Sequence, residues 1–234
     1  MVRLMNIKTP LPAGIKAVIF DLDGTLLDTE KLLFRYWREA ASQYGYDMSP
    51  EQALTLRSLT HRLVQPLFTE WFGEGCDYRQ LRERRMKLMQ EHIDKFGIET
   101  KKGASELLEY LGKNGYMRAV ATATDTVRAE KLLKLAGLDG CFDRIICASM
   151  VDWGKPKPDI YLFTAEKLGL SANECIAVED SPNGVMSAHS AGCYTVMVPD
   201  LTQPDENLES CISAVCSDLG EIIELLEIEG SQKS

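Results

Sequence analysis

Short apolar segments alternate with longer amphipathic segments along most of the chain. The apolar segments are rich in β-branched residues, which favours strands over buried helices. Such an alternation of buried strands and amphipathic helices is typical of an α/β fold with a parallel sheet. We expect strands at Ala17–Asp21, Arg118–Thr122, Arg144–Ala148, Cys175–Glu179 and Tyr194–Val198, and a weaker one at Ala214–Cys216.

The segments between these strands carry signals for the start and the end of helices. Each of the three clearest segments is followed by a glycine, a common residue just past a helix C-terminus. A last helix is expected after Ser217 or Asp218, either of which can cap its N-terminus. The three clearest helices are expected at Val127–Ala136, Asp159–Leu168 and Ser181–Ala191.

One long stretch breaks the alternation. From about Glu30 to Phe96 the pattern is helical throughout, without a convincing β segment. A four- or five-helix insert between the first and second strands accounts for it. We therefore predict an α/β core made of residues 1–29 and 98–234, and a second, all-helical domain at 30–97. The basic run Arg82–Lys87 inside the insert is expected to be a solvated helix face.

The charge balance narrows the partners of the chain. The 234 residues carry 35 acidic and 26 basic side chains, a net charge of −9. Such a chain repels phosphate backbones, so we expect neither nucleic acid nor an anionic membrane as a partner. The sequence shows no signal peptide and no apolar run of about 18 residues. Seven cysteines without CxxC spacing indicate reduced thiols and a cytoplasmic protein.

Acidic and phosphate-binding side chains gather where the expected strands end. In an open α/β sheet, ligands bind beyond the carboxyl ends of the strands, where the strand order reverses. The segment with Lys155 borders the same edge of the sheet. The polar residues at the strand ends are Asp21 and Asp23 after the first strand, Thr122 in the second, and Glu179 and Asp180 in the fourth.

Carboxylates placed this closely repel one another unless a cation neutralises them. Carboxylate oxygens without nearby histidine or cysteine select Mg²⁺. With a hydroxyl, loop amides and a lysine, such a site would bind a phosphoryl group, and an aspartate can accept it covalently. The three histidines lie in helical segments away from this edge: His61, His92 and His189.

The same residues carry a family resemblance. The run Asp21–Glu30, DLDGTLLDTE, resembles the first signature of the haloacid dehalogenase superfamily. Thr122, Lys155 and the run Glu179–Gly184 resemble the second, third and fourth signatures in order and approximate spacing. The resemblance covers nearly the whole chain. It is closest to the branch with a helical cap, which includes β-phosphoglucomutase-like enzymes and sugar-phosphate phosphatases, and it implies a Rossmann-like core with residues 30–97 as the cap.

The resemblance also implies a role for each matching residue. Asp21 would be the nucleophile, forming an aspartyl-phosphate, and would ligate Mg²⁺. Asp23 would protonate the leaving oxygen and then activate water, with its backbone carbonyl on the metal. Lys155 would neutralise Asp21 and the transferring phosphoryl group. The remaining implied contacts are phosphate binding by Gly24, Thr122 and the amide of Ala123, and metal binding by Asp180 and, directly or through water, by Glu179.

The expected activity is Mg²⁺-dependent hydrolysis of a small phosphorylated metabolite, such as a sugar phosphate, by a monomeric phosphoric monoester hydrolase. A β-phosphoglucomutase-type phosphomutase is disfavoured because Leu33 and Asp125 replace a histidine and a lysine that those mutases carry. Asp23 excludes haloalkanoate dehalogenation, whose branch lacks this aspartate. A non-catalytic phosphate-binding protein is a further alternative. Three residues of the insert stay open between substrate contact and helix surface: Arg57, His61 and Arg62.

Overall fold

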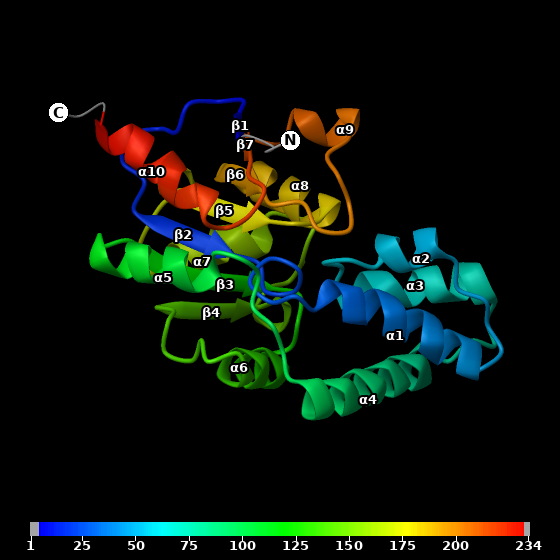
Figure 1. Cartoon of the computed structure of the whole chain (residues 1–234). Coiled ribbons are helices and arrows are strands. Elements are labelled where there is room, and N and C mark those ends of the chain that lie inside the picture. Colours follow the sequence, from blue (N-terminus) through cyan, green and yellow to red (C-terminus); the bar gives the residue numbers. More distant parts are fainter. Residues whose placement is uncertain (1–4, 232–234) are drawn as a thin grey trace.

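The computed structural model describes residues 5–231, and within them seven strands form one sheet in the order β1-β7-β6-β5-β2-β3-β4 (Figure 1). All neighbours pair in parallel except β1 and β7, which are antiparallel. The strands are β1 (Asn6–Ile7), β2 (Ala17–Phe20), β3 (Met117–Thr122), β4 (Arg144–Cys147), β5 (Cys175–Glu179), β6 (Tyr194–Met197) and β7 (Ala214–Val215).

Helices connect these strands. Between β2 and β3 lie α1 (Glu30–Gln43), α2 (Pro50–Thr55), α3 (His61–Phe72), α4 (Tyr78–Phe96) and α5 (Ala104–Lys113). The later helices are α6 (Thr126–Leu135), α7 (Asp159–Leu168), α8 (Pro182–Ala191), α9 (Glu206–Glu209) and α10 (Glu221–Ser231). Two short 3₁₀ turns complete the chain, η1 (Ala148–Met150) and η2 (Ala172–Glu174).

The sheet is buried on both faces, as parallel sheets generally are. Because successive side chains of a strand point to opposite faces, Val18 and Phe20 of β2 pack on the side of α5, α6 and α10. Ala17 and Ile19 pack on the other side, against α7 and α8. The two apolar faces explain why β2 shows a continuous apolar run and no alternation.

Helices α1 to α4 lie beyond the carboxyl ends of the strands (Figure 1). They have an apolar cluster of their own, in which Trp37, Phe68 and Tyr78 pack together. A second set of contacts joins α1 and α4 to the core on the α5 side of the sheet, through residues such as Tyr36 and Met89. The division into core and helical domain at residues 30 and 97 stays a prediction.

The predicted α/β fold class is confirmed. Every expected strand is present, with ends that differ from the expected ones by at most one residue. Strand β1 was not predicted, because two exposed residues at an antiparallel edge carry no hydrophobic pattern. Helices α5 and α9 were not predicted as separate elements either. Across residues 5–231, no helix combines the length and the apolar character needed to cross a membrane.

The strand order reverses at β2, which places a binding crevice there. From β2 the chain continues through β3 and β4 on one side, and returns through β5, β6 and β7 on the other. Both neighbours of β2 run parallel to it in register, with Phe20 opposite Val120 on β3 and Val178 on β5. The residues that follow these three strands therefore meet at one point of the sheet edge.

The core packing gives a first testable prediction. Leu107 of α5 is fully buried, whereas Leu135 at the end of α6 is 50% exposed. Leu107→Ala leaves a cavity against the sheet and is expected to lower the free energy of unfolding by about 2–5 kcal/mol. The matched change Leu135→Ala is expected to lower it by about 0.5 kcal/mol or less. Urea denaturation measures both, and equal losses would contradict the assigned packing.

Candidate active site

The turn after β2 places two aspartates at the crevice. The amide of Asp21 still bonds to the carbonyl of Val178 on β5, at 3.0 Å, so its position is fixed by the sheet. Gly24 follows with a φ of +88°, a left-handed conformation that favours glycine. A Cβ atom on Gly24 would also lie 2.4 Å from a carboxylate oxygen of Asp180. Backbone conformation and close approach both require glycine here.

Asp23 is held by two hydroxyl groups. Thr29, just before α1, donates to its Oδ1 at 2.6 Å, and Thr124, just after β3, donates to its Oδ2 at 2.6 Å. The side chain is buried beside the cavity described below. This arrangement fixes the orientation of the carboxylate and links the β2 turn to the β3 turn.

Lys155 joins two of the predicted carboxylates. Its Nζ lies 2.5 Å from Asp21 Oδ1 and 2.5 Å from Glu179 Oε1, and all three side chains are buried. Tyr161 of α7 donates a further hydrogen bond to Glu179 Oε1 at 2.5 Å. Although burial lowers it, the two carboxylates raise the pKa of Lys155 above its ordinary value, so the lysine stays charged.

A group of three carboxylates could hold a metal ion. One oxygen each of Asp21, Glu179 and Asp180 lie within 4.8 Å of one another, among the residues described. Asp21 Oδ2 and Glu179 Oε2 are buried and have no hydrogen-bond partner in the described part of the chain. Two orphaned carboxylate oxygens in an all-oxygen donor set fit a hard divalent cation such as Mg²⁺. The Asp23 side chain is outside this group, and the role of its backbone carbonyl stays a prediction.

Burial makes ionisation of this group unfavourable. It raises the pKa of Asp21 from 3.8 to about 7, against the opposing effect of Lys155. It also raises the pKa of Asp180 from 3.8 to about 7, against the opposing effect of Arg57. A divalent cation at the site would favour the ionised carboxylates and reverse these shifts.

Arg57, left open by the sequence, contacts the acidic group directly. Its guanidinium forms an ion pair with Asp180, lies 3.2 Å from Glu30 Oε2, and donates to Thr202 Oγ1 at 2.6 Å. Asn183 donates to the carbonyl of Arg57 at 2.9 Å. The loop between α2 and α3 is thereby attached to the sheet edge. Glu30 was not singled out from the sequence, since a glutamate at a helix start is ordinary.

The predicted phosphate-binding positions lie at the end of β3. Thr122 ends that strand, is 1% exposed, and accepts a hydrogen bond from the amide of Thr124 at 3.0 Å. Thr122 and Ala123 line the same cavity as Asp21 and Asp23. Lys155 does not line this cavity but forms an ion pair with Asp21, which does. The structure thus brings the predicted side chains together around Asp21, and their catalytic and binding roles stay predictions.

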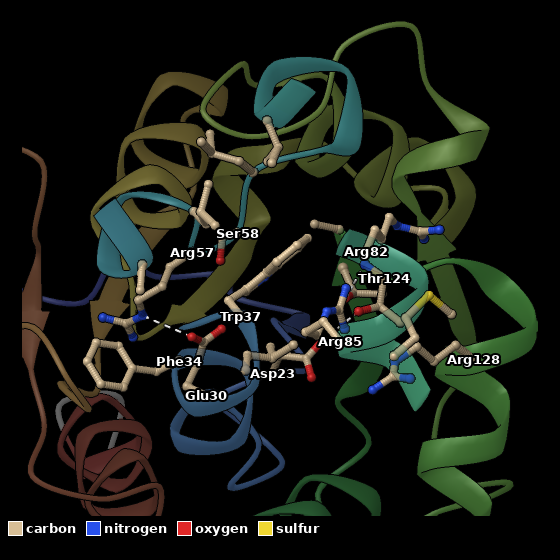
Figure 2. Close-up of a pocket in the computed structure, with 18 of the residues that line it drawn as sticks. Asp23, Glu30, Phe34, Trp37, Arg57, Ser58, Arg82, Arg85, Thr124 and Arg128 are labelled. Carbon is tan, nitrogen blue, oxygen red and sulfur yellow. Dashed lines mark hydrogen bonds and ion pairs between the residues drawn. The ribbon is translucent and has the colours of Figure 1, made fainter. Parts of the chain in front are cut away.

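A cavity of about 110 Å³ lies between this edge and helices α1 to α4 (Figure 2). Arg82 and Arg85 of α4 line it, together with Arg128 of α6. The prediction of a solvated face for Arg82–Lys87 was therefore wrong, because Arg85 is 8% exposed. Helical spacing places residues three apart on one face, here toward the cavity, while Glu83 and Lys87 point to solvent.

His61 and Arg62, whose roles the sequence did not decide, lie at the start of α3. Arg62 is placed over the ring of Trp153, 4.5 Å from its centre, and donates to the carbonyl of Asp152 at 3.4 Å. It therefore contacts the core away from the cavity lining. His61 begins α3, but its side chain is outside the described part of the structure.

Comparisons with known proteins agree on the family. Residues 18–198 match the haloacid dehalogenase-like hydrolase family. Hexitol phosphatase A of Escherichia coli is 35% identical over 186 residues, which cover 78% of this chain and 82% of that protein. A phosphorylated carbohydrates phosphatase of Thermotoga maritima is 31% identical over 178 residues, which cover 76% of this chain and 82% of that protein.

Solved structures show the same fold. A β-phosphoglucomutase from Clostridium difficile aligns with a TM-score of 0.79 at 22% identity, covering 94% of this chain and 98% of that one. CbbY from Rhodobacter sphaeroides, solved in complex with phosphate, aligns with a TM-score of 0.76 at 24% identity, covering 89% of this chain and 96% of that one. At these identities the likeness concerns the fold alone.

The raised pKa of Asp21 predicts how stability depends on pH without metal. In the folded chain Asp21 keeps its proton up to a pH of about 7, while in the unfolded chain it loses it near 3.8. Its contribution to the free energy of unfolding therefore falls as the pH rises between these values.

In a chelator, Asp21→Asn should gain stability relative to the unaltered chain by at least about 1 kcal/mol between pH 4.5 and 7.5. Urea denaturation across this range measures the difference. The exposed change Asp139→Asn is the control and should show no such trend. If the stability difference between Asp21→Asn and the unaltered chain stayed constant with pH, the raised pKa of Asp21 would be contradicted.

Proposed function

The chain belongs to the haloacid dehalogenase-like hydrolase family, and on that premise we propose a Mg²⁺-dependent phosphatase that forms an aspartyl-phosphate. Named relatives within the family are phosphatases, and the chain is accordingly a phosphoric monoester hydrolase. The proposed substrate is a small phosphorylated metabolite, such as a sugar phosphate.

One observation carries the proposal. Asp21 is buried at the point where the strand order reverses, with Oδ1 held by Lys155 and Oδ2 without a partner in the described chain. A carboxylate fixed through one oxygen can present the other to an electrophile. Most buried carboxylate oxygens accept a hydrogen bond, so the unpartnered Oδ2 supports a binding or reacting role for Asp21.

The proposed metal ligands are Asp21 and Asp180, with Glu179 as a direct or water-mediated partner and the Asp23 carbonyl as a further ligand. Their close oxygen atoms support this assignment. When bound, Mg²⁺ would supply positive charge that favours a phosphoryl group beside several carboxylates. The chain contributes a fixed position for each donor, through the sheet and the turn at Gly24.

In the proposed first step, an oxygen of Asp21 forms a bond to phosphorus while the bond from phosphorus to the leaving oxygen breaks. The proton of the Asp23 carboxyl moves to that leaving oxygen, so the product leaves as an alcohol. Lys155, Thr122 and the amide of Ala123 would stabilise the negative charge of the transferring group. The hydroxyls of Thr29 and Thr124 hold the Asp23 carboxyl in one orientation.

In the proposed second step, the Asp23 carboxylate takes a proton from a water molecule as the water oxygen attacks phosphorus. The bond from phosphorus to Asp21 breaks, which releases inorganic phosphate and restores both aspartates. Residues 30–97 would act as the cap over this reaction. Their contacts with the sheet edge, such as Ser58 with Ser181 at 2.8 Å, support a position that excludes bulk water.

The nucleophile assignment can be tested directly. Asp21→Asn is expected to reduce phosphate release from p-nitrophenyl phosphate by at least about 10³-fold, because the amide cannot form the acyl phosphate. Asp139→Asn serves as the matched control on an exposed loop and should retain activity. Retained hydrolysis in Asp21→Asn would show that another group attacks phosphorus.

Metal removal gives a separate test. Dialysis against a chelator should abolish phosphate release, and Mg²⁺ should restore it. Mg²⁺ should also raise the midpoint of thermal unfolding by a few degrees, since it binds only the folded chain. Asp180→Asn should lose most of that rise. Full activity in the chelator, or an unchanged rise in Asp180→Asn, would contradict the proposed metal site.

A further inference from the structure

Three arginines form a cluster on one side of the cavity. Arg82 and Arg85 come from α4, and Arg128 comes from the first turn of α6. Figure 2 shows these three side chains together on one side of the pocket, with Arg57 and Glu30 on the opposite side and Asp23 between them. We refer to Arg82, Arg85 and Arg128 as the arginine cluster.

The central member of the cluster, Arg85, has no hydrogen-bond acceptor among residues 5–231. Arg85 is 8% exposed, its Nε is buried without a partner in the described chain, and its guanidinium lies 4.8 Å from the ring centre of Trp37. Burial, and then the charges of Arg128 and Arg82, lower its pKa to about 9. A buried guanidinium without a hydrogen-bonded anion is strongly unfavourable, so its presence in a cavity needs an explanation.

The other members of the cluster do not supply that anion. Arg128 is partly buried, and its side chain contacts the sulfur of Met89 at 2.8 Å, a weak acceptor. Arg82 pairs with Asp125 at 3.7 Å, where both side chains are partly exposed. The three positive charges of the cluster repel one another, and only nearby acidic side chains of the described chain could offset that repulsion.

The acidic groups that face the cluster are too few to balance it. Asp125 is shared between Arg82 and the α6 N-terminus, where it accepts from the amide of Arg128 at 3.1 Å. Asp23 attracts Arg85 and Arg128, but its two oxygens already accept from Thr29 and Thr124. Arg57 is not part of the cluster. Its ion pairs with Glu30 and Asp180 hold it on the opposite side of the cavity, and these two carboxylates already balance its charge.

The position of the cluster identifies which part of a ligand it would meet. In the proposed reaction Asp23 protonates the leaving oxygen, so the leaving group extends from Asp21 past Asp23. The cluster lines the same cavity next to Asp23, whose charge attracts both Arg85 and Arg128 (Figure 2). It therefore faces the leaving group and not the phosphoryl group that is transferred.

We propose that the arginine cluster binds a second anionic group, a carboxylate or a second phosphate, on the leaving group of the substrate. The inference rests on the proposed phosphatase function and narrows its substrate to phosphorylated sugar acids or sugar bisphosphates. A neutral polyol could accept hydrogen bonds from the guanidiniums but would leave their charge unbalanced. A carboxylate or phosphate matches the planar guanidinium in both charge and geometry.

The experiment compares substrates that differ only in the second anion. The first pair is 6-phosphogluconate and glucitol 6-phosphate, which differ by a carboxylate in place of a hydroxymethyl group. The second pair is fructose 1,6-bisphosphate and fructose 1-phosphate. We expect kcat/KM to be at least about tenfold higher for the doubly anionic member of one pair. The pair that shows the preference tells whether the second anion is a carboxylate or a phosphate.

Variants assign the preference to the cluster. Arg85→Met should lower the ratio of the two kcat/KM values by at least about tenfold, and Arg85→Lys should retain part of the ratio because it keeps the charge. Arg79→Met removes the same charge from an exposed position of the same helix and should leave the ratio unchanged. If Arg85→Met does not fold, judged by urea denaturation, Arg128→Met takes its place.

Binding separates this proposal from the proposed function. In Asp21→Asn, which cannot turn over, calorimetry should show tighter binding of the doubly anionic member and loss of that difference with Arg85→Met. Without any phosphate release from the unaltered chain, this difference would still support the cluster as an anion site while the phosphatase mechanism failed. Equal kcat/KM values and equal affinities within both pairs would overturn the proposal. So would a preference that Arg85→Met does not change.

Discussion

The buried ion pairs of Lys155 are the interaction on which the site depends. Glu179 ends β5 and Asp21 directly follows the neighbouring β2, so the register of the two strands brings their carboxylates together whether or not their charges favour it. Two carboxylates buried this closely can both stay ionised only with a cation between them. Lys155 reaches this point from the loop before α7. The loop, the strand ends and the charge of the lysine are therefore parts of one arrangement.

Small residues let the carboxylates approach so closely. A Cβ atom on Gly184, in the first turn of α8, would lie 1.9 Å from a carboxylate oxygen of Glu179. Gly24 is under the same constraint from Asp180. At both glycines the backbone lies directly against a carboxylate, because no side chain stands between them. One oxygen of Asp21 and one of Glu179 stay without a hydrogen-bond partner among the described residues, so the group can still accept a cation.

The central residues of this arrangement could be predicted from the sequence, because each is marked by its position at the end of its own strand. Asp21, Asp23 and Asp180 follow short apolar strands and Thr122 ends one, and parallel strands bring their carboxyl ends together. The arginine cluster could not be predicted. Whether a helical arginine points to solvent or into a cavity depends on how α4 packs on α1 and the sheet, and the run around Arg85 has the composition of an exposed face.

Arg57 and Glu30 escaped prediction for a related reason. They are 27 residues apart, and their pairing exists only because the loop before α3 folds back onto the sheet edge. The sequence of that loop shows an arginine in a helical pattern, which fits a solvated role equally well. Contacts between segments far apart in the sequence set the environment of Arg57. The hydrophobic pattern of a segment indicates which of its residues face the core, but it does not show which distant residues they contact.

The cavity is consequently divided into two electrostatic halves. Around Asp21 the carboxylates outnumber the cations, so a phosphoryl group can enter only with added positive charge. Around Arg85 the cations outnumber the carboxylates, so an anion can enter without a metal. A doubly anionic ligand would therefore keep one anchoring point when the metal leaves, while a singly phosphorylated ligand would lose its main one. The orientation of a ligand follows from the same division, since a carboxylate held at the cluster leaves the phosphoryl group facing Asp21.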